Sequence, residues 1–324
     1  MILITGGLGF IGQHVAKSLL DLGESCVLGQ RRPTAGPPDW LAAAAAQGGG
    51  RVVVEQVDVA DRAALLDLGA RREITGVVHL AGAMLGPDDP DPVGTARNGI
   101  AGLLNVFEAA QRWGVARVGT ASTIGVYGGV DATVMREDMP LPLDSPHSIP
   151  AFKKADEILA GMLGPATGVE IVSYRIGAIW GPLGRAASLF IAAPQFVHAA
   201  VRGVEPDLSG LRVAVYADDG IDLCYVKDCG RAIALLQTAE KLGHRVYNVA
   251  SGRATTNRQV ADAIRAVVPG AGISVPDGRD PHGYGRDLYL DITRLRQDTG
   301  YEPEYGIERS VADYVAWLRA GNER

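Results

Sequence analysis

Short, continuous apolar runs alternate with longer amphipathic stretches up to about residue 175. A helix is predicted for Phe10 to Leu22, where apolar residues recur at helical spacing, with further helices near 61–70, 96–113 and 151–163. Continuous rather than alternating Val, Ile and Leu indicate strands covered on both faces. The pattern predicts an α/β fold with a doubly wound parallel sheet. The predicted strands are Ile2 to Thr5, Cys26 to Leu28, Val52 to Val54, Val77 to Leu80, Val118 to Ser122 and Ile171 to Tyr174.

After about residue 175, apolar strands and amphipathic helices no longer alternate regularly, and glycine and proline become frequent. One late strand, Arg245 to Ala250, and one late helix, Val260 to Val268, are still evident. We therefore predict two interleaved domains, with a larger sheet domain first and a smaller C-terminal substrate domain after it. The sheet domain takes residues 1–174 and parts of 219–250, and the substrate domain takes 175–218 and 251–324. Residues 33–38 and 47–50 are predicted to be irregular, and the alanine run 42–46 to be a surface helix.

Composition excludes several classes of protein. The 324 residues are 47% apolar and 21% charged, which is typical of a globular chain rather than a disordered one. The net charge of −6 and the lack of a basic block argue against binding to nucleic acid or to an anionic membrane. No signal-like or membrane-spanning segment is apparent, so we expect a cytoplasmic protein. Three cysteines without a cluster of partner ligands predict neither disulfides nor a metal site.

A glycine loop lies directly between the first predicted strand and the first predicted helix. Gly6, Gly9 and Gly12 satisfy the spacing G-x-x-G-x-x-G. Glycine permits the tight turn, lets the backbone approach a diphosphate and lets the helix pack on its strand. The helix N-terminus then offers free N–H groups to the phosphates. In this strand–loop–helix context, the loop predicts a dinucleotide site.

The residues after the second strand bear on which dinucleotide is bound. An acidic residue there usually binds the ribose hydroxyls of NAD(H). Here Gly29 stands at that position, followed by Gln30, Arg31 and Arg32. Because arginine suits a 2′-phosphate, the sequence favours NADP(H) over NAD(H), unless both arginines are ordinary surface charges. Asp58, after the third strand, suits an adenine amino group or, alternatively, caps the helix near 61–70.

Several further motifs accompany the glycine loop, and as a set they resemble the extended short-chain dehydrogenase/reductases. This resemblance implies an NADP-binding Rossmann domain, a smaller substrate domain, and ketone reduction, epimerisation or dehydration. It also suggests a homodimer built on the helices near 98–113 and 151–163, although these faces suit a monomer equally. The motifs are TGGLGFIG at 5–12, DVAD at 58–61, HLAGA at 79–83, Asn98, STIGVYG at 122–128, Arg175, WGP at 180–182, CYVKD at 224–228 and YNVASG at 247–252. The remaining cofactor contacts that it implies are Phe10, Ile11, Val59, Leu80, Ala81, Gly82, Lys153 and Ile176.

The family's catalytic groups are a Ser or Thr, a Tyr and a Lys, the last two spaced Y-x-x-x-K. Thr123 and Lys153 match the first and the last, but Ile149 stands where the tyrosine is expected. His147, in a local S-P-H, aligns with the family's S-P-Y but lies six residues before Lys153. Pro150 is expected to interrupt the helix start there. Three interpretations stay open: reduction without an enzyme acid, a displaced acid at His147 or Tyr127, and a non-catalytic NADP(H)-binding regulator.

A second departure concerns the substrate. Members that act on sugar nucleotides often carry R-x-x-N-x-Y-G-P, whereas this chain has Ala178 and Trp180 at the Asn and Tyr positions. The sequence therefore favours a small-molecule aromatic ketone, and the chain resembles extended members that reduce an angucyclinone. We predict an NAD(P)H-dependent ketoreductase of an aromatic polyketide in antibiotic biosynthesis. The alternatives are an epimerase or dehydratase of a sugar or aldonate, or a regulator. The pocket is assigned to Trp180, Tyr127, Phe196 and Tyr284, with Phe190 as a further candidate. Taken singly, Tyr127 suits the core equally well, and each of the others suits the core better than a pocket.

Overall fold

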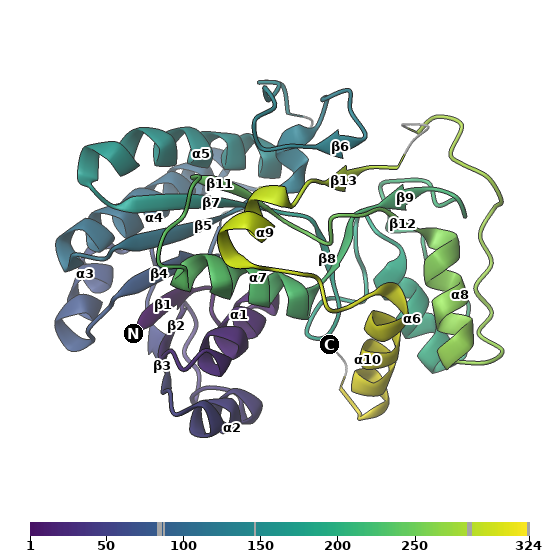
Figure 1. Ribbon diagram of the computed structural model, residues 1–324, viewed down its shortest axis with the longest axis horizontal. Coiled ribbons are helices and arrows are strands. Elements are labelled where there is room, and N and C mark those ends of the chain that lie inside the picture. Colours follow the sequence, from purple (N-terminus) through teal and green to yellow (C-terminus); the bar gives the residue numbers. More distant parts are fainter. Residues whose placement is uncertain (83–85, 87, 146, 284–286, 323–324) are drawn as a thin grey trace.

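A seven-stranded parallel sheet forms the centre of the computed structural model, which describes residues 1–82, 86, 88–145, 147–283 and 287–322 (Figure 1). The strand order is β11-β7-β5-β4-β1-β2-β3. The register places Thr5 beside both Gly29 and His79, so the carboxyl ends of β1, β2 and β4 meet at one edge. The strands are β1 (Ile2–Thr5), β2 (Cys26–Gln30), β3 (Val52–Gln56), β4 (Gly76–His79), β5 (Arg117–Thr123), β7 (Glu170–Ile176) and β11 (Val246–Val249).

Helices cover both faces of this sheet. One face carries α1 (Phe10–Asp21), α2 (Asp39–Gly48) and α7 (Val226–Thr238), and the other carries α3 (Arg62–Arg71), α4 (Pro92–Trp113) and α5 (Ser148–Thr167). Successive strand residues point to opposite faces, so Leu3 packs beneath the second group of helices and Ile4 beneath the first. Both side chains are fully buried. The predicted fold class is confirmed.

A smaller lobe lies beyond the carboxyl edge of the sheet, at the right of Figure 1. We call it the substrate lobe, after the role predicted for it from the sequence. Its own apolar core includes Phe196, Ile264 and Tyr314 from three different helices. The elements of this lobe are β8 (Ala178–Trp180), α6 (Ala193–Arg202), β9 (Gly220–Ile221), β10 (Leu223–Tyr225), β12 (Thr255–Thr256), α8 (Asn257–Val267) and α10 (Ile307–Arg319). Four short elements pack on the core of the sheet domain: η1 (Ile124–Tyr127), β6 (Val134–Met135), β13 (Tyr289–Leu290) and α9 (Thr293–Thr299). The exact division into domains stays a prediction.

Three local predictions differ from the structure. α5 begins at Ser148 rather than 151, because Pro150 falls in the first turn, where a missing N–H loses no helical hydrogen bond. α2 extends beyond the predicted 42–46 and includes Gln47 and Gly48, for which irregular structure is predicted. It is not purely a surface helix, since Leu41, Ala44 and Ala45 are buried against the sheet domain.

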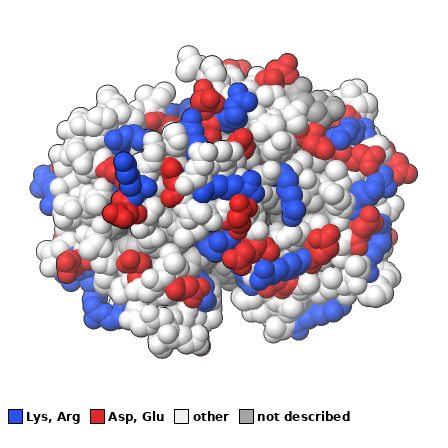
Figure 2. Space-filling model, in the orientation of Figure 1, with Lys and Arg blue, Asp and Glu red and all other residues white. Residues whose placement is uncertain are grey.

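The described residues bear on the sequence predictions for membrane spans, cysteines, metal ligands and surface charge. No helix in the described part of the chain is long and apolar enough to cross a membrane. Cys26, Cys224 and Cys229 are buried and free. No three His, Cys, Asp or Glu side chains among the described residues are grouped to hold a metal ion. Acidic and basic side chains are interspersed on the face drawn in Figure 2.

Candidate active site

The glycine loop leaves backbone N–H groups open at the start of α1. Gly6 has a φ of +69°, which favours glycine, and a Cβ on Gly12 would stand 2.4 Å from the carbonyl oxygen of Gly6. Gly9 is the N-cap of α1 and provides no side chain to cap the helix. The first turn of α1 has no acidic residue. The loop therefore has the free donors and the positive dipole end that suit a diphosphate.

A cavity of about 500 Å³ opens beside this loop at the carboxyl edge of the sheet. Gly29 and Arg31 from the end of β2 line one wall, and Asp58 and Val59 line another. The volume and the mixed polar lining fit the adenosine half of a nicotinamide dinucleotide. The other lining residues are Thr5, Gly6, Gln30, Val57, Ala60, His79, Ala81, Gly82, Thr95, Asn98 and Gly99.

The two arginines after β2 differ in their position. Arg31 lines the cavity, whereas Arg32 is exposed and is not part of its wall. The alternative interpretation of Asp58 as the cap of α3 is wrong. Asp61 caps that helix by accepting from the backbone N–H of Ala64 at 3.0 Å. Asp58 closes a turn with the N–H of Ala60 and stays at the cavity.

Lys153 reaches toward the cavity from α5. Its Nζ lies 3.0 Å from an oxygen of Asp156 and 3.6 Å from the point that a Cβ on Gly82 would occupy. The neighbouring Lys154 is buried and points elsewhere, donating to the carbonyl oxygens of Pro142 and Asp144. Only Lys153 of this pair is therefore directed at the predicted cofactor site.

A buried ion pair fixes α5 against the sheet. Arg175 on β7 donates to both oxygens of Glu157, the nearest contact being 2.7 Å, and both side chains are less than a tenth exposed. Ser122 donates a further hydrogen bond to Glu157. Because Glu157 is four residues after Lys153, this network sets the position of Lys153 along the carboxyl edge.

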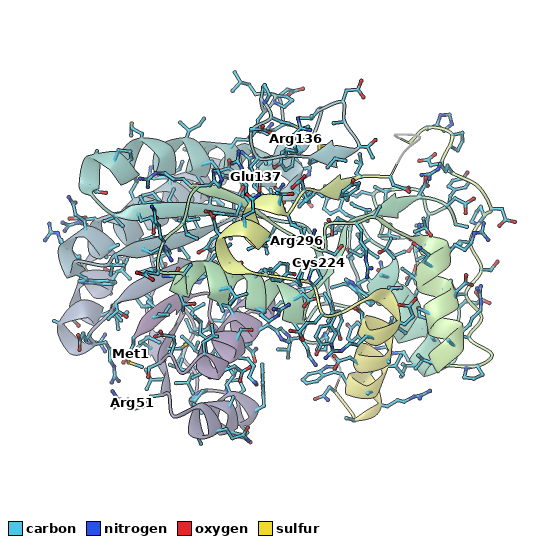
Figure 3. The ribbon with its side chains drawn as sticks, viewed as in Figure 1. Met1, Arg51, Arg136, Glu137, Cys224 and Arg296 are labelled. Carbon is cyan, nitrogen blue, oxygen red and sulfur yellow. The ribbon has the colours of Figure 1, made fainter. Side chains whose placement is uncertain are left out.

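Tyr127 belongs to the same network and not to the substrate pocket. Its hydroxyl accepts from Arg175 at 2.9 Å and donates to Asn248 at 2.7 Å, and the residue is only 2% exposed. Burial raises the pKa of Tyr127 to about 12. The prediction of Tyr127 as a substrate contact or displaced acid is therefore wrong. Glu137, labelled in Figure 3, lies on the same network and accepts from the N–H of Asn248 at 2.9 Å.

Thr123 and the start of α5 meet at the end of β5. The Oγ1 of Thr123 accepts from the N–H of Gly125 at 3.1 Å and so caps η1. A Cβ on Gly125 would stand 3.1 Å from the ring of Pro150, so the first turn of α5 packs against η1. Ile149 lies in that turn and is half-buried. The position one helical turn before Lys153 thus carries no acid or base.

His147 is the N-cap of α5 and faces the substrate lobe. Its ring stacks on Phe190, with centroids 5.6 Å apart. Burial lowers the pKa of His147, and the charge of Arg212 lowers it further. Phe190 and Arg212 both line a second cavity, of about 640 Å³, in the substrate lobe. His147 therefore contacts a residue of the cavity wall without being part of that wall, and Pro146 before it is outside the described residues.

Two predicted pocket residues belong to the core instead. Phe196 is fully buried in α6, and Trp180 is 2% exposed, with its ring edge-on to those of Tyr225 and Tyr314. Trp180 only borders a third cavity, beside the glycine loop. Tyr284 lies outside the described residues. No sequence motif surrounds Arg212, so the sequence gives no signal for its position at the second cavity. His79, a polar residue at the end of an apolar strand, does indicate the carboxyl edge of the sheet.

The remaining predicted contacts of the cofactor lie at or near the same edge. Ala81 donates its N–H to Oγ1 of Thr5 at 3.2 Å, and Leu80 donates to the carbonyl oxygen of Thr5. Ile176 is buried at the end of β7, and Ile11 is half-buried in the first turn of α1. Their roles toward a cofactor stay predictions.

Comparison with known proteins identifies the family. Residues 2–250 match the model of the NAD dependent epimerase/dehydratase family, and the chain belongs to this family. A dTDP-glucose 4,6-dehydratase of Streptomyces griseus is 29% identical, the match covering 98% of this chain and 93% of the relative. A UDP-glucose 4-epimerase of Azospirillum brasilense is also 29% identical, over 98% of this chain and 92% of the relative.

The fold of this chain also resembles solved structures over nearly its whole length. The UDP-glucose 4-epimerase of Thermus thermophilus in complex with NAD is 26% identical, with a TM-score of 0.75 and 99% of each chain covered. The UDP-glucose 4-epimerase of Thermotoga maritima gives a TM-score of 0.79 at 24% identity, also over 99% of each chain, which shows the fold. These relatives favour the sugar epimerase or dehydratase alternative over the predicted ketoreductase of antibiotic biosynthesis. They also associate the family with NAD, and the expected preference for NADP(H) stays a prediction.

Proposed function

We propose that this chain is a nicotinamide-dependent enzyme that acts on a carbinol or carbonyl carbon of a sugar-type substrate, in the manner of a sugar epimerase or dehydratase. The observation that carries the proposal is the match of dehydratase and epimerase relatives over 98% of the chain. It is supported by the open glycine loop, the adjoining cavity and the direction of Lys153.

Each part of the site has a distinct task in this proposal. When bound, the nicotinamide supplies the chemistry of hydride transfer. The N–H groups of Phe10 and Ile11 bind the diphosphate, and Asp58 binds the adenine amino group. Lys153, held by Asp156, binds the hydroxyls of the nicotinamide ribose. Arg31 lines the cavity where a 2′-phosphate would lie, which favours NADP(H).

The proton of a carbinol needs an acceptor before its hydride can leave. Ile149 cannot provide one, and Thr123 is too weak a base on its own. His147, the N-cap of α5, stacks on Phe190, which lines the cavity of the substrate lobe. Its lowered pKa keeps the imidazole neutral at pH 7, so that it can accept a proton. We therefore assign the proton transfer of an epimerase to His147.

Within this reaction class, epimerisation is better supported than dehydration. Elimination of water needs a base for one carbon and an acid for the neighbouring hydroxyl. The residues that follow Thr123 are Ile124 and Gly125, which carry no ionisable group. Neither residue can provide the second proton-transfer group that a dehydratase needs, which favours an epimerase.

The apolar Ile149, where an acid is expected, favours a second candidate function, the reduction of a ketone. Reduction of a ketone needs no base, and its alkoxide can take a proton from water, from Thr123 or from a hydroxyl of the substrate. A ketone beside a phenol is already polarised by its internal hydrogen bond, which lowers the need for an enzyme acid. This supports a ketoreductase of an aromatic polyketide as the alternative function.

One experiment separates these functions. Purified protein is incubated with NAD⁺ or NADP⁺ and UDP-glucose or dTDP-glucose, and separately with NADPH or NADH and a panel of aromatic hydroxyketones. We expect NMR to detect an epimer of the sugar without net change in the cofactor. Stoichiometric oxidation of NADPH by an aromatic ketone would support the ketoreductase instead. Binding of the cofactor with no turnover in either panel would favour a regulator.

A further inference from the structure

The loop between β8 and α6 is held tightly against the first turns of α1. The Nε2 of buried His14 donates to the carbonyl oxygen of Pro182 at 3.1 Å. Burial lowers the pKa of His14 to about 4, so the ring is neutral at pH 7. A Cβ on Gly184 would stand 2.9 Å from the ring of Phe10. A segment of the substrate lobe therefore lies in direct contact with the helix that follows the glycine loop.

This loop also contains a strained residue. Leu183 has a φ of +69°, and it is the one non-glycine residue in the described ranges with a positive φ. A leucine in this region is unfavourable and persists only where the surroundings impose it. Here the hydrogen bond at Pro182 and the close packing of Gly184 impose it from both sides. Such strain is concentrated at functional sites and ligand clamps.

The strained loop presents an unpaired cation beside the glycine loop. Arg185 borders a cavity of about 550 Å³ whose wall also contains Gly9, Phe10 and Gln13 of the loop and α1. Its side chain is exposed and, among the residues that the structure describes, it has no hydrogen-bond or ion-pair partner. By contrast, Arg175 and Arg231 on neighbouring elements lie 2.7 Å and 3.3 Å from carboxylate oxygens.

We propose that Arg185 binds the diphosphate of the dinucleotide from the side of the substrate lobe, opposite the glycine loop. This rests on the proposed function only in taking a nicotinamide dinucleotide as the ligand. The free N–H groups of α1 and the guanidinium would then hold the same anion from two lobes. The strained loop places the backbone of Arg185 at the border of the same cavity as the glycine loop. Cofactor binding would thereby tie the substrate lobe to the sheet.

The test compares Arg185→Ala and Arg185→Lys with a control at Arg51. Arg51 is exposed, forms no ion pair within the described part of the chain, and lies near Met1 (Figure 3). It precedes β3 and is therefore at the amino edge of the sheet, whereas the glycine loop is at the carboxyl edge. Calorimetry measures the Kd of NADPH, NADH, ADP-ribose and adenosine 2′-monophosphate, of which only the last lacks a diphosphate. Thermal melting checks that each variant is folded.

We expect Arg185→Ala to raise the Kd of the three diphosphate ligands about 10- to 100-fold, as loss of a charged hydrogen bond does. Arg185→Lys should raise these Kd values by less. Arg51→Ala should leave the Kd of every ligand unchanged, and no variant should change the Kd of adenosine 2′-monophosphate. Equal affinities of Arg185→Ala and the unaltered protein for ADP-ribose would overturn the inference. A rise in the Kd of adenosine 2′-monophosphate as large as that for the diphosphate ligands would also overturn it. If the unaltered protein bound no dinucleotide, the proposed function would fail as well.

Discussion

Ile149 lies one helical turn before Lys153 on the same face of α5, and both side chains are half-buried. Residues four apart on a helix lie one above the other, so a side chain at position 149 shares the direction in which Lys153 points. Lys153 is directed at the cavity beside Gly82. The apolar side chain of Ile149 therefore occupies the place from which an acid–base group beside this lysine would act.

Replacing Ile149 by tyrosine should add an acid–base group to the site. We expect Ile149→Tyr to raise the rate of hydride transfer at least about tenfold, since general acid–base catalysis contributes roughly 10²- to 10⁴-fold when well placed. The pH–rate profile should also gain a new limb. Ile149→Phe is the matched control, because it adds the ring without the hydroxyl. Similar rates for both variants would contradict this assignment of position 149.

Substitution of Lys153 should weaken cofactor binding, whereas substitution of Lys154 should lower stability. Lys153→Met removes a cation that faces the cavity, and we expect the Kd of the dinucleotide to rise about tenfold with little change in melting. Lys154→Met leaves two carbonyl oxygens near α5 without their donor, and we expect a loss of about 1–3 kcal/mol in unfolding free energy with the Kd unchanged. Calorimetry and urea unfolding measure the two quantities, and the reverse pattern would rule out the predicted role of Lys153.

The fold and the glycine loop were predictable because local rules determine both. A parallel strand buried on both faces must be apolar at successive positions, as Leu3 and Ile4 are. Gly12 must be glycine because any Cβ would meet the backbone of Gly6. The sequence predicts the start of α5 three residues late, because a proline suggests an interruption. Pro150 instead lies in the first turn, where its missing N–H loses no helical hydrogen bond.

The walls of the substrate site were less predictable. Whether Phe196 faces a pocket or the core depends on how α6 packs on α8 and α10, which lie far away in the sequence. Tyr127 is buried because Arg175, on a strand much later in the chain, binds its hydroxyl. The positive φ of Leu183 has no signal in the sequence at all, because leucine does not favour it. Such features arise from tertiary contacts that a single sequence does not reveal.

Arg31 and Arg32 should contribute unequally to the choice of cofactor. Arg31 lines the cavity and Arg32 does not, although both are exposed and adjacent. We expect Arg31→Ala to raise the Kd of NADPH about 10- to 100-fold and to change that of NADH by less than about threefold. Arg32→Ala is the matched control and should have a small effect on both. Equal weakening of NADPH and NADH by Arg31→Ala would show that no 2′-phosphate is bound there.

Two buried histidines should make the protein sensitive to acid. Burial lowers the pKa of His14 to about 4 and that of His79 to about 3, and Lys153 adds to the effect at His79. In the unfolded chain both residues have a pKa near about 6.5. Between about pH 6.5 and about 4 the unfolded state therefore binds protons that the folded state does not. Stability that is fully present above about pH 6.5 is lost as the pH falls through this window.

The loss can be measured by urea unfolding at pH 7 and pH 4.5. Each histidine contributes up to about 1.4 kcal/mol per pH unit below about 6.5, so the two together should lower the unfolding free energy by about 3–5 kcal/mol at pH 4.5. Other groups titrate in the same range, so the contribution is read from the difference between the unaltered protein and His14→Gln/His79→Gln. The double variant should be less stable at pH 7 but should lose much less on acidification. An identical loss in both proteins would mean that these histidines already bind protons in the folded state near pH 6.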